Sequence, residues 1–330
     1  MSKVKRIIDI ANSDKKSVYN ILTFPTHERY ETQLCKTGHN FYALNIKDGK
    51  KWNESQTPIP DNYYILPENQ VCEYINYDFI LVQSKFGQYQ IAKQLNTSLM
   101  LPIIVLEHTL PTPQTISHQN LEKMRNMIGD INIFISEYSQ NEWSIDTDST
   151  VIHHGIDGLT FKHLDLTKEN HVLTVANDFV NRDYCLNYSG WKRITDGLPV
   201  KLIGDTKGLS VSASSTEELV EEYNKCAVYF NSSTISPIPT SLLEAMSCGA
   251  AVVSTATCMI PDIIQNGING FISNNEEELK SYITTLLDNE DLRKKIGHEA
   301  RKTILEKFSE QSFLNKWNSV FDNIYEVSTL

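Results

Sequence analysis

Short runs of apolar residues alternate, along the first half of the chain, with stretches in which apolar positions recur at helical spacing. The runs have the length of buried strands and lie at residues 19–24, 41–44, 78–82, 103–106, 131–136 and 150–152. Helical spacing separates them, as over residues 26–34 and 88–95. Strands that alternate with helices in this way predict an α/β fold built on a doubly wound parallel sheet.

The same alternation restarts in the second half of the chain. Strand-like runs lie at residues 172–175, 201–203, 228–230 and 250–253, and helical patterns at residues 216–223, 276–287 and 291–307. A last amphipathic helix has its apolar face at Phe313, Trp317, Val320, Phe321 and Ile324. The pattern therefore predicts a second doubly wound domain followed by one long helix.

Residues 231–271 carry the most specific pattern in the chain. Pro237 and Pro239 lack the backbone donor that a strand interior needs, so they mark a loop. Leu242, Leu243 and Met246 then have helical spacing. The stretch is therefore predicted to form a strand, a loop, a short helix and a second strand.

This short helix is predicted to favour phosphate at its start. It opens at Thr240 and Ser241, and we expect the free backbone N–H groups from Thr240 to Leu242 and the positive end of the helix dipole to attract an anion. Glu244 follows one turn after Thr240 and is predicted to point to the same side. Gly249 ends the helix, because a glycine just past the last turn readily takes the left-handed conformation.

Several segments of this stretch resemble the donor-site signature of the retaining GT-B glycosyltransferases of family four, also called group 1. The matching segments are Glu244–Met246, Gly249, Val252–Val253, Pro261–Ile263 and Asn269–Phe271. The resemblance implies two Rossmann-like, doubly wound domains that face each other across a cleft. It implies an acceptor-side domain over residues 1–156, a nucleotide-sugar donor domain over residues 157–311, and a C-terminal helix over residues 312–330 that packs back on the first domain.

The resemblance implies transfer of a sugar from a nucleotide diphosphate donor to a hydroxyl of a glycan, lipid or other acceptor, with retention of anomeric configuration. One position departs from the family. Ser236 stands where the family has the first glutamate of a pair, which helps to seat the transferred sugar. The resemblance thus supports nucleotide binding more firmly than sugar transfer. A catalytically weak nucleotide-sugar-binding homologue and a GT-B epimerase remain alternatives.

The resemblance also implies a set of donor-binding residues in the second domain. Glu244 is expected to hold the ribose, with a solvated surface carboxylate as the alternative. The family's diphosphate-binding Arg and Lys align with Asn177 and Arg182, so Arg182 is the candidate catalytic cation, with a surface arginine paired with Asp183 as the alternative. The predicted donor contacts are Glu244, Ser236, Pro237, Ile238, Thr240, Ser241, Gly204 and Asn177.

Three residues of the first domain are candidates for the rest of the site. His108 follows a predicted strand, at a place where family enzymes often have a histidine that faces the donor sugar, and we treat it as catalytic, with a structural histidine as the alternative. His27 and Arg29 follow the first strand and are candidates for contact with the acceptor. The glycine-rich loop that the family often has there is absent.

Composition narrows the possible partners. The net charge of −11 argues against nucleic acid, whose binding relies on Lys and Arg. The six cysteines have no C-x-x-C spacing and are predicted to be buried, reduced thiols.

No segment has transmembrane length and the apolar run near the N-terminus is too short for a signal peptide, so we expect a cytoplasmic protein. No cofactor or metal is expected, since His153 and His154 would point apart on a strand.

Overall fold

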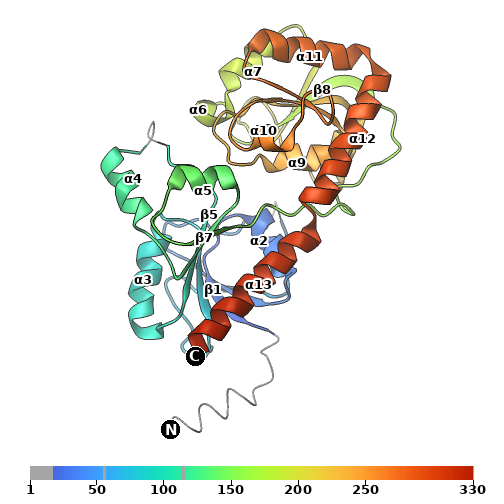
Figure 1. The fold of residues 1–330 in the computed structure, drawn as a ribbon. Helices are drawn as coiled ribbons and strands as arrows, with labels where there is room; N and C mark the ends of the chain where they lie inside the picture. The colour runs from blue at the N-terminus through green and yellow to red at the C-terminus, as the bar shows by residue number, and fades with distance from the viewer. Residues whose placement is uncertain (1–17, 55–56, 113–115, 330) are drawn as a thin grey trace. The chain divides into compact units, whose positions relative to one another are not determined.

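The computed structural model describes residues 18–54, 57–112 and 116–329, so the N-terminal segment considered for a signal peptide lies outside the described residues (Figure 1). The chain divides into two compact units. The first contains the residues up to Phe134, Ser144–Ile152 and the residues from Leu314 on; the second contains Ile135–Trp143 and His153–Phe313. The sequence suggested boundaries after residues 156 and 311, with the last helix returning to the first domain. In the structure the residues from Leu314 on belong to the first unit, and Ile135–Trp143 belong to the second.

The first unit is built on a parallel sheet of seven strands in the order β3-β2-β1-β4-β5-β6-β7. The strands are β1 (Asn20–Thr23), β2 (Asn40–Leu44), β3 (Tyr63–Leu66), β4 (Phe79–Val82), β5 (Ile103–Glu107), β6 (Ile131–Phe134) and β7 (Ser149–Val151). The register pairs Leu22 of β1 with Tyr42 of β2 on one side and Ile80 of β4 on the other. The expected doubly wound sheet is therefore confirmed.

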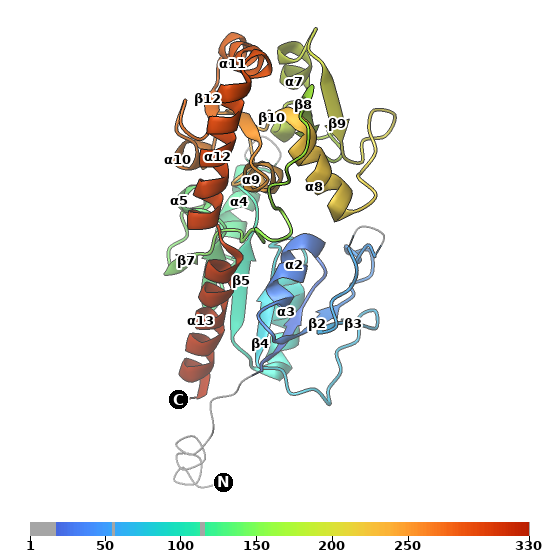
Figure 2. The same cartoon turned by 90° about the vertical axis from the view of Figure 1, so that its right-hand side faces the viewer.

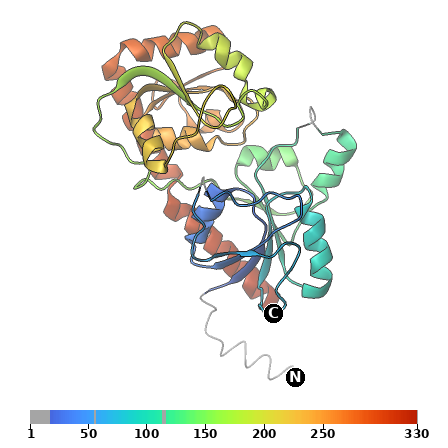
Figure 3. The same ribbon diagram turned by 180° about the vertical axis from the view of Figure 1, so that it is seen from behind.

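The helices of the first unit are α2 (Glu28–Cys35), α3 (Gln88–Leu99), α4 (His118–Arg125) and the greater part of α13 (Glu310–Thr329). Alternate residues of β4 face opposite ways: Ile80 and Val82 share a core cluster with Ala92 of α3, whereas the ring of Phe79 stacks on Phe321 of α13. Accordingly, α3 and α13 lie on opposite faces of the sheet (Figure 3).

The second unit contains a parallel sheet of five strands in the order β12-β11-β10-β8-β9. The strands are β8 (Glu169–Val175), β9 (Val200–Ile203), β10 (Cys226–Asn231), β11 (Ala251–Thr255) and β12 (Phe271–Ser273). The helices are α5 (Glu137–Trp143), α6 (Asp183–Leu186), α7 (Tyr188–Ile194), α8 (Thr216–Lys225), α9 (Thr240–Ser247), α10 (Ile260–Ile263), α11 (Glu276–Asp288) and α12 (Glu290–Lys307) (Figure 2).

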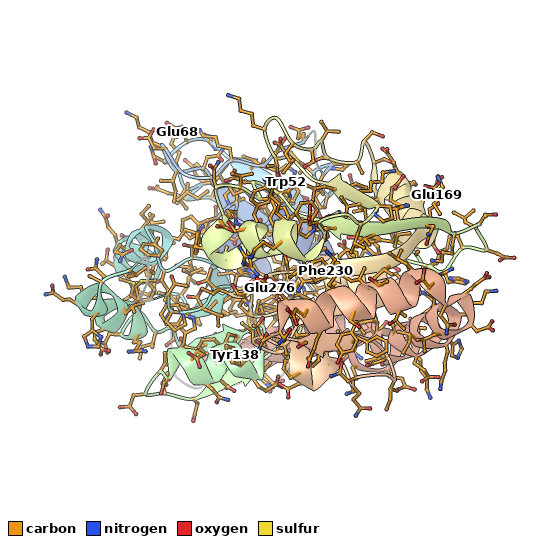
Figure 4. All side chains as sticks on the ribbon, turned by 90° about the horizontal axis from the view of Figure 1, so that it is seen from above. Trp52, Glu68, Tyr138, Glu169, Phe230 and Glu276 are labelled. Carbon is orange, nitrogen blue, oxygen red and sulfur yellow. The ribbon has the colours of Figure 1, made fainter. Side chains whose placement is uncertain are left out.

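Each face of this second sheet has its own helices. Val228, Phe230 and Val253 point to the face covered by α7 and α11, where Phe230 is completely buried (Figure 4). Tyr229 points to the opposite face, and its hydroxyl donates to Oγ of Ser241 on α9. A strand covered on both faces has an unbroken run of apolar residues, which is why β10 could be predicted from the sequence.

Two strands at the edges of the sheets, β3 and β12, were not predicted. β3 is bordered on one side only, and its middle residues Tyr64 and Ile65 are exposed, so it lacks the apolar run of a central strand. β12 has only three residues. In the described part of the chain, no helix combines the length and the apolar character needed to cross a membrane.

Candidate functional site

The loops after β8 and β9 are joined at the carboxyl edge of the second sheet. Oδ1 of Asn177 accepts from the backbone N–H of Asp205 at 2.8 Å. Gly204 has φ +127°, and a Cβ at this position would lie 2.0 Å from the carbonyl oxygen of Ala176. Only glycine therefore fits there. These two predicted donor residues lie close together, and both have a structural role in holding the loops.

Arg182 lies at the same edge, at the N-terminus of the short helix α6, and is exposed. Across the described residues its guanidinium makes no hydrogen bond or ion pair. Asp183 instead accepts from the N–H and hydroxyl of Ser189, each at 2.7 Å, and these bonds hold its pKa below the ordinary value. The alternative in which Arg182 pairs with Asp183 is therefore wrong, and the guanidinium is available to an anion.

The start of α9 offers two open backbone donors. Pro239 is the N-cap, and no side chain caps the helix. The N–H groups of Leu242 and Leu243 both donate to the carbonyl of Pro239, at 3.1 and 3.3 Å. We predicted open donors from Thr240 to Leu242, and Leu242 is a correction, because the tight first turn uses its N–H. Among the described residues the N–H groups of Thr240 and Ser241 have no protein acceptor.

Gly249 ends α9 as predicted. It has φ +77°, and its N–H donates to the carbonyl of Met246 while the N–H of Ala250 donates to that of Ala245. This is the Schellman arrangement, in which a left-handed residue reverses the chain. The backbone then enters β11 directly, so Gly249 defines the C-terminal end of α9.

Glu244 is buried, with only 2% of its surface exposed. Its Oε2 accepts from the hydroxyl of Tyr223 on α8 at 2.9 Å. The interpretation as a solvated surface carboxylate is therefore wrong. A buried carboxylate needs hydrogen-bond donors, and the Tyr223 hydroxyl orients this one on the same helix as the two open N–H groups.

Polar residues at the carboxyl ends of β10 and β11 hold the loop between β10 and α9, and these residues were not predicted. The carbonyl of Ser233 accepts from the hydroxyls of Thr255 and Thr257, and the side chain of Asn231 donates to Oγ of Ser254 at 2.8 Å. Farther along the loop, Pro237, Ile238 and Pro239 are buried, while Ser236 and Thr240 are half-buried. A polar run directly after an apolar strand was the signal that could have revealed this support.

In the first unit, the structure brings His108 and His27 together. Their ring centroids are 4.5 Å apart, and the ring of Tyr30 lies 4.7 Å from that of His108. Nε2 of His108 is 3.3 Å from Oε1 of Gln83, at the carboxyl end of β4. His27 and Arg29 are both exposed at the start of α2. Glu31 and Gln83, which contact this group, were not predicted.

No group of three or more His, Cys, Asp or Glu side chains is arranged to hold a metal ion in the described ranges. His153 instead pairs with Glu137, whose Oε2 lies 2.7 Å from its Nε2.

A cavity of about 830 Å³ in the second unit lies away from these residues. It is lined by Ala227 and Ala251, near the amino ends of their strands, and by residues of α12 such as Arg301. None of the predicted site residues lines it, so we place the candidate site at the carboxyl edge, where open parallel sheets bind ligands.

Two all-parallel α/β units, with a strand-loop-helix-strand site at the carboxyl edge of the second sheet, define the GT-B class of glycosyltransferases. Comparison with known proteins agrees with this class. Residues 209–303 match the family model "Glycosyl transferases group 1", which covers β10, α9, β11, β12 and α11. The chain thus resembles the group 1 glycosyltransferases, and the match lies in its second unit.

Two curated proteins are similar to this chain in sequence, and one solved structure is similar to it in fold. The chain is 25% identical over 345 residues to the uncharacterized glycosyltransferase MJ1178 of Methanocaldococcus jannaschii, which covers 97% of this chain and 92% of that protein. A second protein of that organism, the uncharacterized glycosyltransferase MJ1069, is 32% identical over 89 residues, or 26% of this chain and 23% of its own length. The solved structure of Anabaena HepE in complex with UDP has a TM-score of 0.75 at 15% identity, covering 93% of this chain and 100% of HepE.

Proposed function

We propose that this protein transfers a sugar from a nucleotide diphosphate donor to an acceptor hydroxyl, with retention of anomeric configuration and without a metal ion or cofactor. The observation that carries the proposal is the start of α9: the open N–H groups of Thr240 and Ser241 lie one turn before the buried Glu244, within the region that matches group 1. Backbone donors suit a diphosphate, and a carboxylate suits the paired hydroxyls of a ribose.

The chemistry in this proposal is mainly electrostatic. Departure of the nucleoside diphosphate develops negative charge, which the guanidinium of Arg182 and the N–H groups of Thr240 and Ser241 would stabilise. Fixed donors such as the two backbone N–H groups are worth about 3–4 kcal/mol each when they face the charge that develops in the transition state. His108 of the first unit would contact the sugar, and His27 and Arg29 the acceptor. Cytoplasmic location remains part of the proposal.

A direct assay tests this function. The protein is incubated with a panel of nucleotide sugars, beginning with UDP-sugars because HepE was solved with UDP. Free nucleoside diphosphate is measured with and without candidate acceptors, and the anomeric configuration of any product is read by NMR. Release that depends on an acceptor supports a transferase, and an inverted product would contradict retention.

We predict that a nucleoside diphosphate raises the melting temperature in the presence of EDTA. A ligand that binds only the folded state adds about 2.7 kcal/mol at a hundredfold excess over its dissociation constant. UDP, GDP and ADP are compared by differential scanning fluorimetry, with the matching nucleosides as controls for the phosphate contribution. If none of the three diphosphates moves the transition, the nucleotide site is wrongly placed.

Ser236 keeps a second candidate function open, that of a nucleotide-sugar-binding protein with weak catalysis. Its half-buried hydroxyl stands where the family has a carboxylate. In an active transferase, we predict that Ser236→Glu lowers turnover with the native donor, because the change puts a partly desolvated charge into a site shaped for a hydroxyl. Ser236→Ala is the matched control, which removes the hydroxyl and adds no charge.

The outcomes separate the two candidates. Robust turnover in the wild type that falls in Ser236→Glu excludes the binding protein. Nucleotide affinity without turnover in the wild type, together with donor hydrolysis that appears only in Ser236→Glu, excludes the active transferase.

A further inference from the structure

Glu31 is a buried carboxylate that receives four hydrogen bonds. It is 1% exposed, and its Oε2 accepts from the backbone N–H groups of Thr26 and His27, both at 2.9 Å. Its Oε1 accepts from the hydroxyl of Tyr63 at 2.7 Å and from Nε2 of Gln83 at 3.0 Å. Burial raises the pKa of Glu31, while its donors oppose that shift. All four contacts are donors, so this carboxyl acts only as an acceptor.

The bond from Gln83 fixes which way its amide points. Nε2 of Gln83 donates to Glu31 and also lies 3.3 Å from Oγ1 of Thr23, whose own hydroxyl donates to the carbonyl of Leu81. Both neighbours on that side are therefore acceptors, and only the amide nitrogen can face them. The amide oxygen must point the other way, toward Nε2 of His108 at 3.3 Å.

An amide oxygen cannot donate, so the ring nitrogen that faces it has to carry a hydrogen. In the neutral imidazole this places the hydrogen on Nε2 and leaves Nδ1 as the acceptor nitrogen of His108. A chain of hydrogen bonds with one polarity thus runs from His108 through Gln83 to Glu31. The neighbouring carboxylate, Glu107, takes no part: its Oε1 accepts from the N–H and hydroxyl of Thr109, and its Oε2 has no hydrogen-bond partner among the described residues.

We infer that Glu31 is a positioning residue for the reaction, which through Gln83 holds His108 as the Nε2–H tautomer and so keeps Nδ1 as the acceptor nitrogen of the ring. The role of His108 toward the sugar rests on the proposed function; the tautomer does not. The other oxygen of Glu31 holds the backbone of Thr26 and His27, so one buried carboxylate organises both segments that carry the histidines.

The substitution Glu31→Gln tests the donor-to-acceptor direction of the hydrogen bonds that run from His108 through Gln83 to Glu31. The two backbone donors keep the oxygen of the new amide on their side, so its NH₂ group must face Gln83. The amide of Gln83 then turns its oxygen toward position 31 and its nitrogen toward His108. We expect the neutral ring of His108 to change from the Nε2–H to the Nδ1–H tautomer, as read from long-range ¹H–¹⁵N spectra and assigned with His108→Gln.

Two matched variants complete the experiment. Tyr63→Phe removes a donor to the same Oε1 of Glu31 and should leave the tautomer of His108 unchanged. Gln83→Met removes the amide that links His108 to Glu31, so the tautomer should no longer respond to Glu31→Gln. Turnover in Glu31→Gln should fall about a hundredfold with little change in the KM for the donor. The same substitution in a His108→Ala background should add little further loss.

The results separate the inference from the proposed function. An Nδ1–H ring in the wild type, or an Nε2–H ring that persists in folded Glu31→Gln, overturns the inference whatever the activity. A changed tautomer without turnover on any donor tested would leave the hydrogen-bond chain intact and remove the transferase. Equal losses of turnover in Glu31→Gln with and without His108 would show that Glu31 acts only on the fold.

Discussion

Replacing Trp317 with alanine is expected to lower the free energy of unfolding of the first unit by about 3–5 kcal/mol. The indole is fully buried, and its Nε1 donates to the hydroxyl of Tyr30 at 3.0 Å. Its ring also lies 5.3 Å from that of Phe321, one turn further along α13. The substitution therefore removes a large apolar volume and a buried hydrogen bond together. Urea unfolding followed by circular dichroism measures the change.

Trp317→Phe is the matched control for this prediction. It keeps an aromatic ring in the core and removes the indole N–H, so about 1–2 kcal/mol should be lost. A Trp317→Ala variant that unfolds at the wild-type urea concentration would show that the end of α13 contributes nothing to the stability of the first unit.

Glu244→Gln is expected to weaken nucleotide affinity about ten- to a hundredfold, which corresponds to roughly 1.5–3 kcal/mol. The glutamine has the same shape, and its amide oxygen can still accept from the hydroxyl of Tyr223, so folding should change little. What is lost is the charge of the acceptor that we propose for the ribose. Isothermal titration with a nucleoside diphosphate measures the effect.

Tyr223→Phe distinguishes ligand binding from support of the helix. It removes the hydroxyl that donates to Glu244 at 2.9 Å but keeps the carboxylate. We expect a smaller loss of affinity than in Glu244→Gln. Wild-type affinity in a well-folded Glu244→Gln variant would assign Glu244 to the packing between α8 and α9.

The sequence was most informative where both faces of a strand are covered. β4 and β10 read as unbroken apolar runs because every residue in them is buried. The β3 edge could not be predicted in the same way, because its exposed middle residues break the run. The two ends of α9 were predicted from proline and glycine chemistry, which acts locally and needs no knowledge of the rest of the chain.

The candidate site was predictable only in part. Glu244 and Arg182 came from a resemblance to a known family, and the structure then showed that the first is buried and the second has no pair with Asp183. Glu31 and Gln83 could not be found, because they are 52 positions apart and meet only when β1 pairs with β4. Leu242 was wrongly assigned an open N–H. Its N–H donates within the tight first turn of α9, and the sequence does not reveal the backbone geometry of that turn.

Residues 314–329 are the last part of the first unit to be synthesised. Tyr19 and Phe79 leave the ribosome early, but Phe321 and Tyr325, whose rings pack against them, follow only after the whole of residues 153–313. At about 5–20 residues per second, that interval lasts on the order of ten to thirty seconds. Throughout it Tyr19 and Phe79 lack the aromatic rings that cover them in the folded unit, so this is the surface that we expect a chaperone to shield during translation.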